Sequence, residues 1–174
     1  MEKNDGISPD ELKALHTKKE DVVFDYSDLT ESSLKNIDEL HKLFPQWHRK
    51  SVIRKLKLTG EGKNLRFVAR KNGKIIAHVK LIFGTGIHSH VVSITSLVVD
   101  SKERRQGIGI GLMTYALSKL SKSILVTTLA VDSKNKAAIN LYKKIGFERY
   151  GLLKQASKIQ GKFVDNYLME KQFS

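Results

Sequence analysis

Runs of alternating apolar and polar residues divide much of the chain into short strands. Asn72 and Gly73 separate two such runs, and Asn-Gly between strand-like segments is a strong signal for a tight hairpin turn. A later run ends near Val99, just before a charged turn. The pattern predicts strands at residues 22–26, 65–70, 74–83, 91–99, 124–131, 147–154 and 163–171.

Apolar residues at helical spacing occupy most of the segments between these strands. A first helix begins near Thr30 and is interrupted at Pro45, and a basic second helix is expected at 47–58. A third begins at a glycine-rich turn and continues through 112–120. The fourth is expected to be capped at Ser133 and to stop at Gly146. The apolar face of the first helix consists of Leu34, Ile37, Leu40, Leu43 and Phe44.

The order of these elements predicts the fold class. Hairpins followed by strand–helix repeats indicate an α/β (α+β) protein with a mixed sheet and helices on both faces. A length of 174 residues suits one domain with a substantial core. Residues 1–20 are polar, with a short helix expected from Ser8, so we interpret them as an N-terminal extension to a single domain at 21–174.

Composition narrows the class of protein. Hydrophobic residues make up 40% of the chain, and no apolar run reaches the roughly 20 residues that span a bilayer. The first residues lack the apolar segment of a secretory signal, and there is no cysteine for disulfides or thiolate metal sites. We therefore expect a cytoplasmic enzyme or binding protein that does not associate with membranes.

The formal net charge of +13 has two interpretations. Such a charge is typical of proteins that bind nucleic acid or another acidic partner. It also fits a lysine-rich composition combined with one anionic site, because the charges are scattered along the chain.

The strongest candidate for a ligand site is the turn that contains Gly107, Gly109 and Gly111. Glycines between a strand and a helix allow backbone N–H groups to approach an anion closely. The helix N-terminus adds a favourable dipole. The turn therefore predicts a cradle for a phosphorylated cofactor.

Two known phosphate-binding motifs fit this turn poorly. A Walker A loop requires Gly-Lys-Ser/Thr, whereas Gly111 is followed by Leu112 and Met113. A dinucleotide fingerprint has an acidic residue about 20 residues further on, a place that Asp132 superficially fits. However, Gly111 comes one position early, and residues 100–106 separate the strand from the first glycine. A purely structural turn before a helix is the remaining alternative.

Two motifs together resemble a known family. The stretch Arg104-Arg-Gln-Gly-Ile-Gly109 resembles the Arg/Gln-x-x-Gly-x-Gly/Ala signature of the GCN5-related N-acetyltransferases (GNAT family). Residues 135–147 are similar to that family's second motif, Asn-x-x-Ala-x-x-Leu-Tyr-x-x-x-Gly-Phe, and residues 161–169 look like the last strand of many bacterial members. The resemblance covers roughly residues 20–172. It implies a mixed, mostly antiparallel sheet of six to seven strands, with acetyl-CoA as co-substrate and no metal.

The resemblance also implies which residues bind acetyl-CoA. Arg104 and Arg105 are expected to pair with phosphates, although either is alternatively a solvated arginine. Asn135 and Ala138 match positions near the cofactor arm, with helix capping and helix propensity as the alternatives. Backbone N–H groups for the pyrophosphate are expected at Gln106, Gly107, Ile108, Gly109 and Gly111, and the pantetheine arm is expected to lie beside Leu97, Val98 and Val99.

Tyr142 is the candidate catalytic residue. In many family members, the tyrosine at this place protonates the leaving thiolate of coenzyme A. A phenol of pKa about 10 is a modest acid toward a thiol of pKa about 8.5. The alternative is that Tyr142 is a packing residue beside Leu141.

The base that would deprotonate the acceptor is not evident. Many relatives place a glutamate on the strand before the glycine turn, but no carboxylate lies between Glu61 and Asp100. A water held by Thr95 or Ser96 is one substitute. His88 and His90 are further candidates, because they share a face if their segment is extended.

The resemblance implies direct transfer in a ternary complex to the primary amine of a small molecule or a protein N-terminus. Asp165 and Tyr167 are expected to border the acceptor pocket. Trp47 and His48 are further candidates for its wall, with core packing as the other interpretation of Trp47.

A basic RNA- or ribosome-binding module with a degenerate cofactor site is the competing function. No aromatic cluster for RNA is present, so nucleic-acid binding is disfavoured, and the oligomeric state, homodimer included, stays open.

Overall fold

The computed structural model describes residues 25–28, 37–44, 64–159 and 161–173. The expected extension at 1–20, the basic helix at 47–58, and the side chains of Trp47 and His48 lie outside the described residues.

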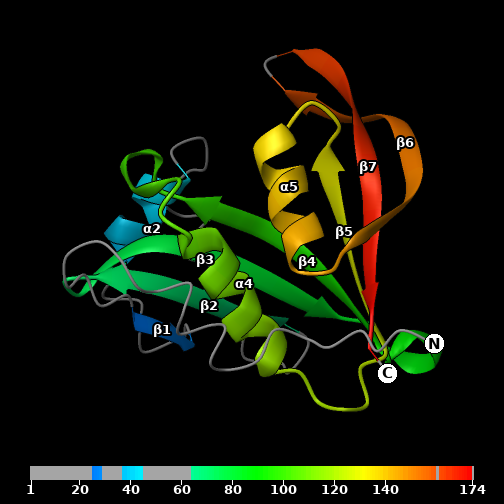
Figure 1. The fold of residues 1–174 in the computed structure, drawn as a ribbon, viewed down its shortest axis with the longest axis horizontal. Coiled ribbons are helices and arrows are strands. Elements are labelled where there is room, and N and C mark those ends of the chain that lie inside the picture. Colours follow the sequence, from blue (N-terminus) through cyan, green and yellow to red (C-terminus); the bar gives the residue numbers. More distant parts are fainter. Residues whose placement is uncertain (1–24, 29–36, 45–63, 160, 174) are drawn as a thin grey trace.

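The described strands form one seven-stranded sheet in the order β1-β2-β3-β4-β5-β7-β6 (Figure 1). All neighbouring pairs are antiparallel except β4 and β5, which are parallel. The expected mixed, mostly antiparallel sheet is therefore confirmed. The strands are β1 (Asp25–Asp28), β2 (Asn64–Lys71), β3 (Lys74–Phe83), β4 (Val91–Val99), β5 (Val126–Asp132), β6 (Glu148–Ile159) and β7 (Lys162–Gln172).

Helices lie on both faces of the sheet, as expected. Phe67 of β2 packs edge-on against Tyr115 of α4 (Ile108–Ser118), with ring centroids 5.8 Å apart. Phe44, which follows α2 (Ile37–Leu43), packs edge-on against His78 of β3 at 5.3 Å. Phe67 lies opposite Val79, and successive side chains point to opposite faces, so His78 and Phe44 lie on the face away from α4.

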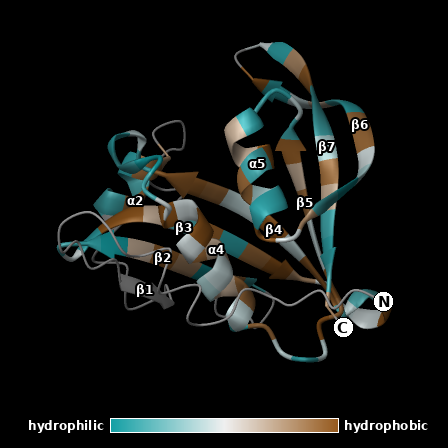
Figure 2. Ribbon diagram, viewed as in Figure 1, coloured by the Kyte–Doolittle hydropathy of each residue, from teal (hydrophilic) through white to brown (hydrophobic). Residues whose placement is uncertain are grey.

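The main core lies between the sheet and α4. Leu112, Met113 and Ala116 of α4 are fully buried against β2, β3 and β4. Figure 2 shows hydrophobic residues along much of the central strands. α5 (Lys136–Lys144) lies on the same side as α4, and its buried Tyr142 joins this core (Figure 1).

The start of α5 differs from the expectation. Asn135, not Ser133, is the N-cap, and its side-chain oxygen accepts a hydrogen bond from the N–H of Ala138 at 3.1 Å. The carboxylate of Asp132 accepts from the N–H of Lys134 at 2.8 Å and keeps these residues in a turn. The N–H of Ser133 instead donates to Asp165 O at 2.9 Å. Capping by Asn135 therefore starts the helix later than predicted.

β4 and β5 pair over only part of their length. Their register runs from Val91 opposite Val126 to Ile94 opposite Leu129 and then stops. β4 nevertheless continues to Val99 and β5 to Asp132, and Figure 1 shows the two strands diverging. The later part of β4 therefore presents an edge that β5 does not pair.

Among the described residues, no helix has the length and apolar character that crossing a membrane requires.

Candidate active site

The turn between β4 and α4 is held by its own side chains. The N–H of Asp100 donates to Ile76 O at 2.8 Å, and the Asp100 carboxylate caps a short 3-10 turn, Ser101–Glu103, by accepting from the N–H of Lys102 at 2.9 Å. The Nε of Arg104 donates to Val99 O at 3.1 Å. These contacts fix the path of the chain from the end of β4 into α4.

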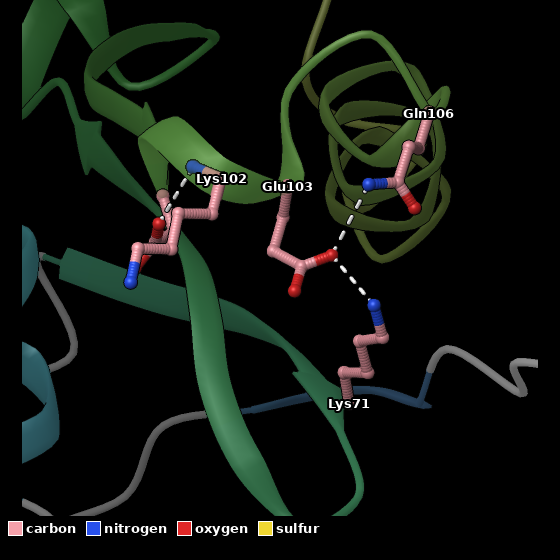
Figure 3. Close-up of polar contacts among 5 residues, drawn as sticks. Lys71, Lys102, Glu103 and Gln106 are labelled. Carbon is pink, nitrogen blue, oxygen red and sulfur yellow. Dashed lines mark hydrogen bonds and ion pairs between the residues drawn. The ribbon is translucent and has the colours of Figure 1, made fainter.

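Glu103 joins this turn to the β2–β3 hairpin (Figure 3). Its carboxylate accepts from Lys71 Nζ at 2.8 Å and from Gln106 Nε2 at 3.2 Å. The expected site residue Gln106 is therefore oriented by an ion pair that begins on another element. The ion pair between Lys71 and Glu103 could not be predicted from the sequence, because the two residues are distant along the chain.

The N-terminus of α4 supplies unpaired amides. Gly107 is the N-cap at a left-handed φ of 79°, which suits a residue without a Cβ. The first intrahelical bond runs from the N–H of Gly111 to Gly107 O at 3.0 Å. The N–H groups of residues 107–110 precede that bond and have no partner within the helix. Gly111 thus contradicts the expectation of a free amide, and the amide of Ile110 takes its place.

Gly109 is where α4, α5 and β4 come together. A Cβ built on Gly109 would lie 2.7 Å from Leu141 Cδ1 and 3.6 Å from Val99 Cγ2. Glycine at this position therefore permits close packing between the cradle helix and the helix that carries Tyr142. The sequence explains this glycine by the close approach of an anion and gives no sign of its packing role.

Backbone alternation decides which amides of β4 face the open edge. The carbonyl of Val91 accepts from Gly84 on the β3 side, whereas His90 O accepts from Leu125 on the β5 side. The N–H of Asp100 points to β3 again. In a regular strand the N–H of residue 100 would face β5, so one extra residue has been inserted between Val91 and Asp100.

That insertion is a β-bulge at Ser96. Ser96 has a left-handed φ of 56°, and the β3–β4 register shifts from His78 opposite Val98 to Lys80 opposite Thr95. Counting back from Asp100, the amides of Leu97 and Val99 face the open edge and that of Val98 faces β3. The expectation for Val98 as a backbone contact is therefore wrong, whereas Leu97 and Val99 remain candidates.

The sequence carried a signal for this bulge. Val92 and Ile94 are buried, and Leu97 and Val99 pack against the same core. The residues of β4 that face the core are thus two, three and then two positions apart along the chain. A regular alternation would have placed the hydroxyl of Ser96 in the core.

Arg104 and Arg105 flank the cradle and are both exposed. The Nε of Arg104 donates to Val99 O, and its other guanidinium nitrogens could donate to a ligand. Arg105 has a left-handed φ of 65°, a conformation that costs a non-glycine residue about 1–2 kcal/mol. Contact of either side chain with a bound phosphate stays a prediction.

Tyr142 is buried in the core, 8% exposed, with its ring packed against Phe147 at 5.9 Å. Burial raises its pKa to about 12. The ring therefore packs as the alternative interpretation expected, and the hydroxyl stays protonated at physiological pH. Its role as an acid remains a prediction.

Two residues of the second family motif, Asn135 and Ala138, also have structural roles. The Asn135 side chain caps α5, and Ala138 is half-buried against the core. The capping interpretation of Asn135 is confirmed, and contact of either residue with a cofactor arm stays a prediction.

The two histidines suggested as bases do not share one extended segment. His88 ends a 3-10 turn, Gly86–His88, and His90 precedes β4. A role for either histidine as a base stays a prediction. Thr95 and Ser96 remain near the open edge, with the Thr95 hydroxyl donating to Lys80 O at 3.5 Å.

Asp165 and Tyr167 of β7 have structural partners on β6. The Asp165 carboxylate accepts from the N–H of Gln155 at 2.8 Å and so ties β7 to β6. The Arg149 guanidinium lies over the Tyr167 ring at 4.5 Å. Whether an acceptor also meets them stays a prediction.

Among the described strands, only β4 and β5 pair in parallel, and they part beside the glycine-capped start of α4. The sequence matches the family described as Acetyltransferase (GNAT) family over residues 33–147. This match covers more than half of the chain, and the chain belongs to the GNAT family.

Curated relatives have varied acceptors in their names. The L-amino acid N-acetyltransferase AaaT of Escherichia coli (strain K12) is 29% identical over 109 residues, which are 61% of this chain and 67% of that protein. A mycothiol acetyltransferase of Streptosporangium roseum is 36% identical over 76 residues, which are 42% of this chain. The chain spans only 23% of the length of the mycothiol enzyme.

Solved structures share the fold at low sequence identity. A ribosomal-protein-alanine N-acetyltransferase from Brucella melitensis has a TM-score of 0.76 at 19% identity and covers 85% of this chain and 99% of its own. A GNAT-family acetyltransferase from Streptococcus pneumoniae has a TM-score of 0.75 at 21% identity, with 87% and 100% covered. These similarities establish the fold.

Proposed function

We propose that the protein is an N-acetyltransferase that moves an acetyl group from acetyl-CoA to a primary amine of a small molecule or a protein N-terminus. One observation carries the proposal. Among the described residues, amides without a partner at the start of α4 and on the open edge of β4 lie near each other where β4 and β5 part, because Gly109 approaches Val99. Helix amides suit a pyrophosphate, and a strand edge suits the amide-bearing arm of the same molecule.

The charge and the hydrogen-bond donors of the described residues support acetyl-CoA as the ligand. The amides of residues 107–110 and the exposed Arg104 and Arg105 would hold its phosphates. The edge amides of Leu97 and Val99 would hold its arm. When bound, acetyl-CoA supplies an activated acetyl thioester.

The proposed reaction is direct. The neutral amine nitrogen of the acceptor bonds to the thioester carbonyl carbon, the carbon–sulfur bond breaks, and the nitrogen loses its proton. Tyr142 would donate its phenolic proton to the departing sulfur and recover one from solvent. With no carboxylate between Asn64 and Val99, we assign removal of the amine proton to water near Thr95.

Isothermal titration calorimetry of the purified protein tests the proposed cofactor. We expect micromolar binding of acetyl-CoA and no binding of NAD or ATP at the same concentrations. Absence of acetyl-CoA binding would overturn the proposal, and steeply salt-dependent RNA binding would then favour the competing module.

Substitution of Tyr142 by Phe tests the proposed acid. We expect turnover with a good acceptor amine to fall at least about tenfold, because general acid catalysis typically contributes 10²–10⁴-fold, while the acetyl-CoA Kd changes less than about twofold. Tyr150→Phe, which removes the hydroxyl of a tyrosine that is 55% exposed, is the matched control and should leave turnover unchanged. Undiminished turnover in Tyr142→Phe would remove the acid role.

A further inference from the structure

His78 lies in the middle of β3, 1% exposed, on the sheet face opposite α4. One ring nitrogen is 3.2 Å from Arg66 Nη1 and the other is 3.3 Å from Ser96 O. The ring of Phe44 packs against the His78 ring in a T-shaped arrangement. A histidine so enclosed, outside the cradle, has no role in the chemistry described above.

The contacts fix the tautomer of the ring. A guanidinium can only donate, so His78 Nε2 accepts from Arg66 and carries no proton. The single proton of the neutral ring is therefore on Nδ1, which donates to Ser96 O. Burial, followed by the charge of Arg66, lowers the pKa of His78 to about 3 and keeps this neutral form at physiological pH.

Ser96 is the residue whose conformation needs support. Its left-handed φ of 56° is unfavourable for a residue that carries a Cβ, and such strain persists only where neighbouring groups hold it. The bulge also turns the Ser96 carbonyl away from the regular β3–β4 ladder, and His78 supplies its hydrogen-bond donor.

The bulge decides what the open edge of β4 presents. With Ser96 inserted, the amides of Leu97 and Val99 face the open edge. Without it, the amide of Val98 would face that edge and the side chains of Leu97 and Val99 would leave the core. The contact between His78 and Ser96 is thus coupled to the surface that the cofactor arm would meet.

We propose that His78 is a positioning residue, which holds the Ser96 bulge through its Nδ1–H and thereby sets the register of the cofactor-facing edge of β4. The part of this proposal that concerns the cofactor rests on the proposed function. The part that concerns the register stands on the ligand-free protein.

Two substitutions separate the two contacts of His78. In His78→Asn, the amide nitrogen occupies roughly the place of Nδ1 and keeps a donor for Ser96 O. In His78→Gln, the amide oxygen reaches roughly the place of Nε2 and keeps an acceptor for Arg66. Both are polar and buried, so loss of packing affects them alike.

Amide hydrogen exchange by NMR on the ligand-free protein reads the register directly. In the natural protein and in His78→Asn, we expect slow exchange at Val98 and Asp100 and exchange at least tenfold faster at Leu97 and Val99. In His78→Gln, this contrast should fall below about threefold. An unchanged contrast in His78→Gln would overturn the proposal, whether or not acetyl-CoA binds.

Ser96→Gly provides a rescue, because glycine adopts the left-handed conformation without strain. We expect His78→Gln to raise the acetyl-CoA Kd at least tenfold, and addition of Ser96→Gly to restore most of the affinity and the exchange contrast. A weakened Kd that Ser96→Gly leaves uncorrected would contradict the proposal. If the natural protein binds no acetyl-CoA, the proposed function fails and the exchange experiment still decides the role of His78.

Discussion

At the scale of single residues, burial sets the charge of His78. Desolvation first, and the neighbouring charge of Arg66 second, lower its pKa from 6.5 to about 3, although the hydrogen bond to Ser96 acts in the opposite direction. The folded protein therefore keeps this ring neutral over a pH range in which the unfolded chain protonates it.

This difference predicts an acid-dependent loss of stability. Between pH 6.5 and about 3 the unfolded state binds the extra proton, so the free energy of unfolding falls as the pH falls through that window. Above pH 6.5 the contribution is fully present. From pH 7 to pH 4.5 we expect His78 to account for a loss of about 2–3 kcal/mol, measured by urea denaturation.

His78→Asn is the control for that loss, because it has no titrating group at this position. Carboxylates lower the stability of both proteins in acid, so the quantity to follow is the difference between them. That difference should shrink by about 2–3 kcal/mol between pH 7 and pH 4.5. A constant difference would show that the folded protein protonates His78 with the pKa of the unfolded chain.

The residues of the cradle were predictable and the residues that support it were not. Gly107 and Arg104 stand in a local motif, so their place was evident from the sequence. His78, Arg66 and Glu103 act through partners on other strands or turns, and only tertiary structure brings those partners together.

At the scale of elements, the contact between α4 and α5 constrains Gly109. A bulky residue here would block the approach of a phosphate to the cradle. It would also disturb the packing, because a Cβ at Gly109 already meets the end of the Leu141 side chain at 2.7 Å. Alanine requires only that this flexible methyl move, whereas a branched side chain also meets Val99.

We therefore expect Gly109→Val to lower the free energy of unfolding by about 1–3 kcal/mol, and Gly109→Ala by less than about 1 kcal/mol. Leu141→Ala in the same chain should recover part of the Gly109→Val loss, since it makes room between the helices. Guanidinium denaturation measures all four proteins. Equal stability of Gly109→Val and the natural protein would rule out the tight contact.

Elements defined by a long pattern were predicted well. The strand expected at 74–83 is β3 itself, Lys74–Phe83, because the Asn72-Gly73 turn marks its start and Gly84 follows its last residue. The start of α5 was misplaced because two adjacent candidates for a cap compete, and the Asp132 turn decides between them. The bulge in β4 was missed because a strand was assumed to keep one register.

At the scale of the whole molecule, the net charge of +13 bears on cofactor association. Acetyl-CoA is a polyanion, so a positive protein should attract it and salt should screen the attraction. We expect the acetyl-CoA Kd to rise about tenfold between 50 mM and 500 mM NaCl, measured by calorimetry.

Arg105→Asn is the matched variant, because asparagine tolerates the left-handed backbone at this position. It should weaken binding at low salt and make the salt dependence shallower. A Kd independent of salt in the natural protein would mean that the charge serves another partner.

The place of β7 in the sheet has a consequence for biosynthesis. β7 lies between β5 and β6 and pairs with both, yet it is the last of the described strands to be made. While a ribosome is still producing residues 162–172, β6 has no neighbour, and one edge of β5 is bare. Until that stretch has been made, the nascent chain therefore exposes one unpaired strand and one unpaired strand edge, which is the period in which a chaperone that shields such edges would matter most.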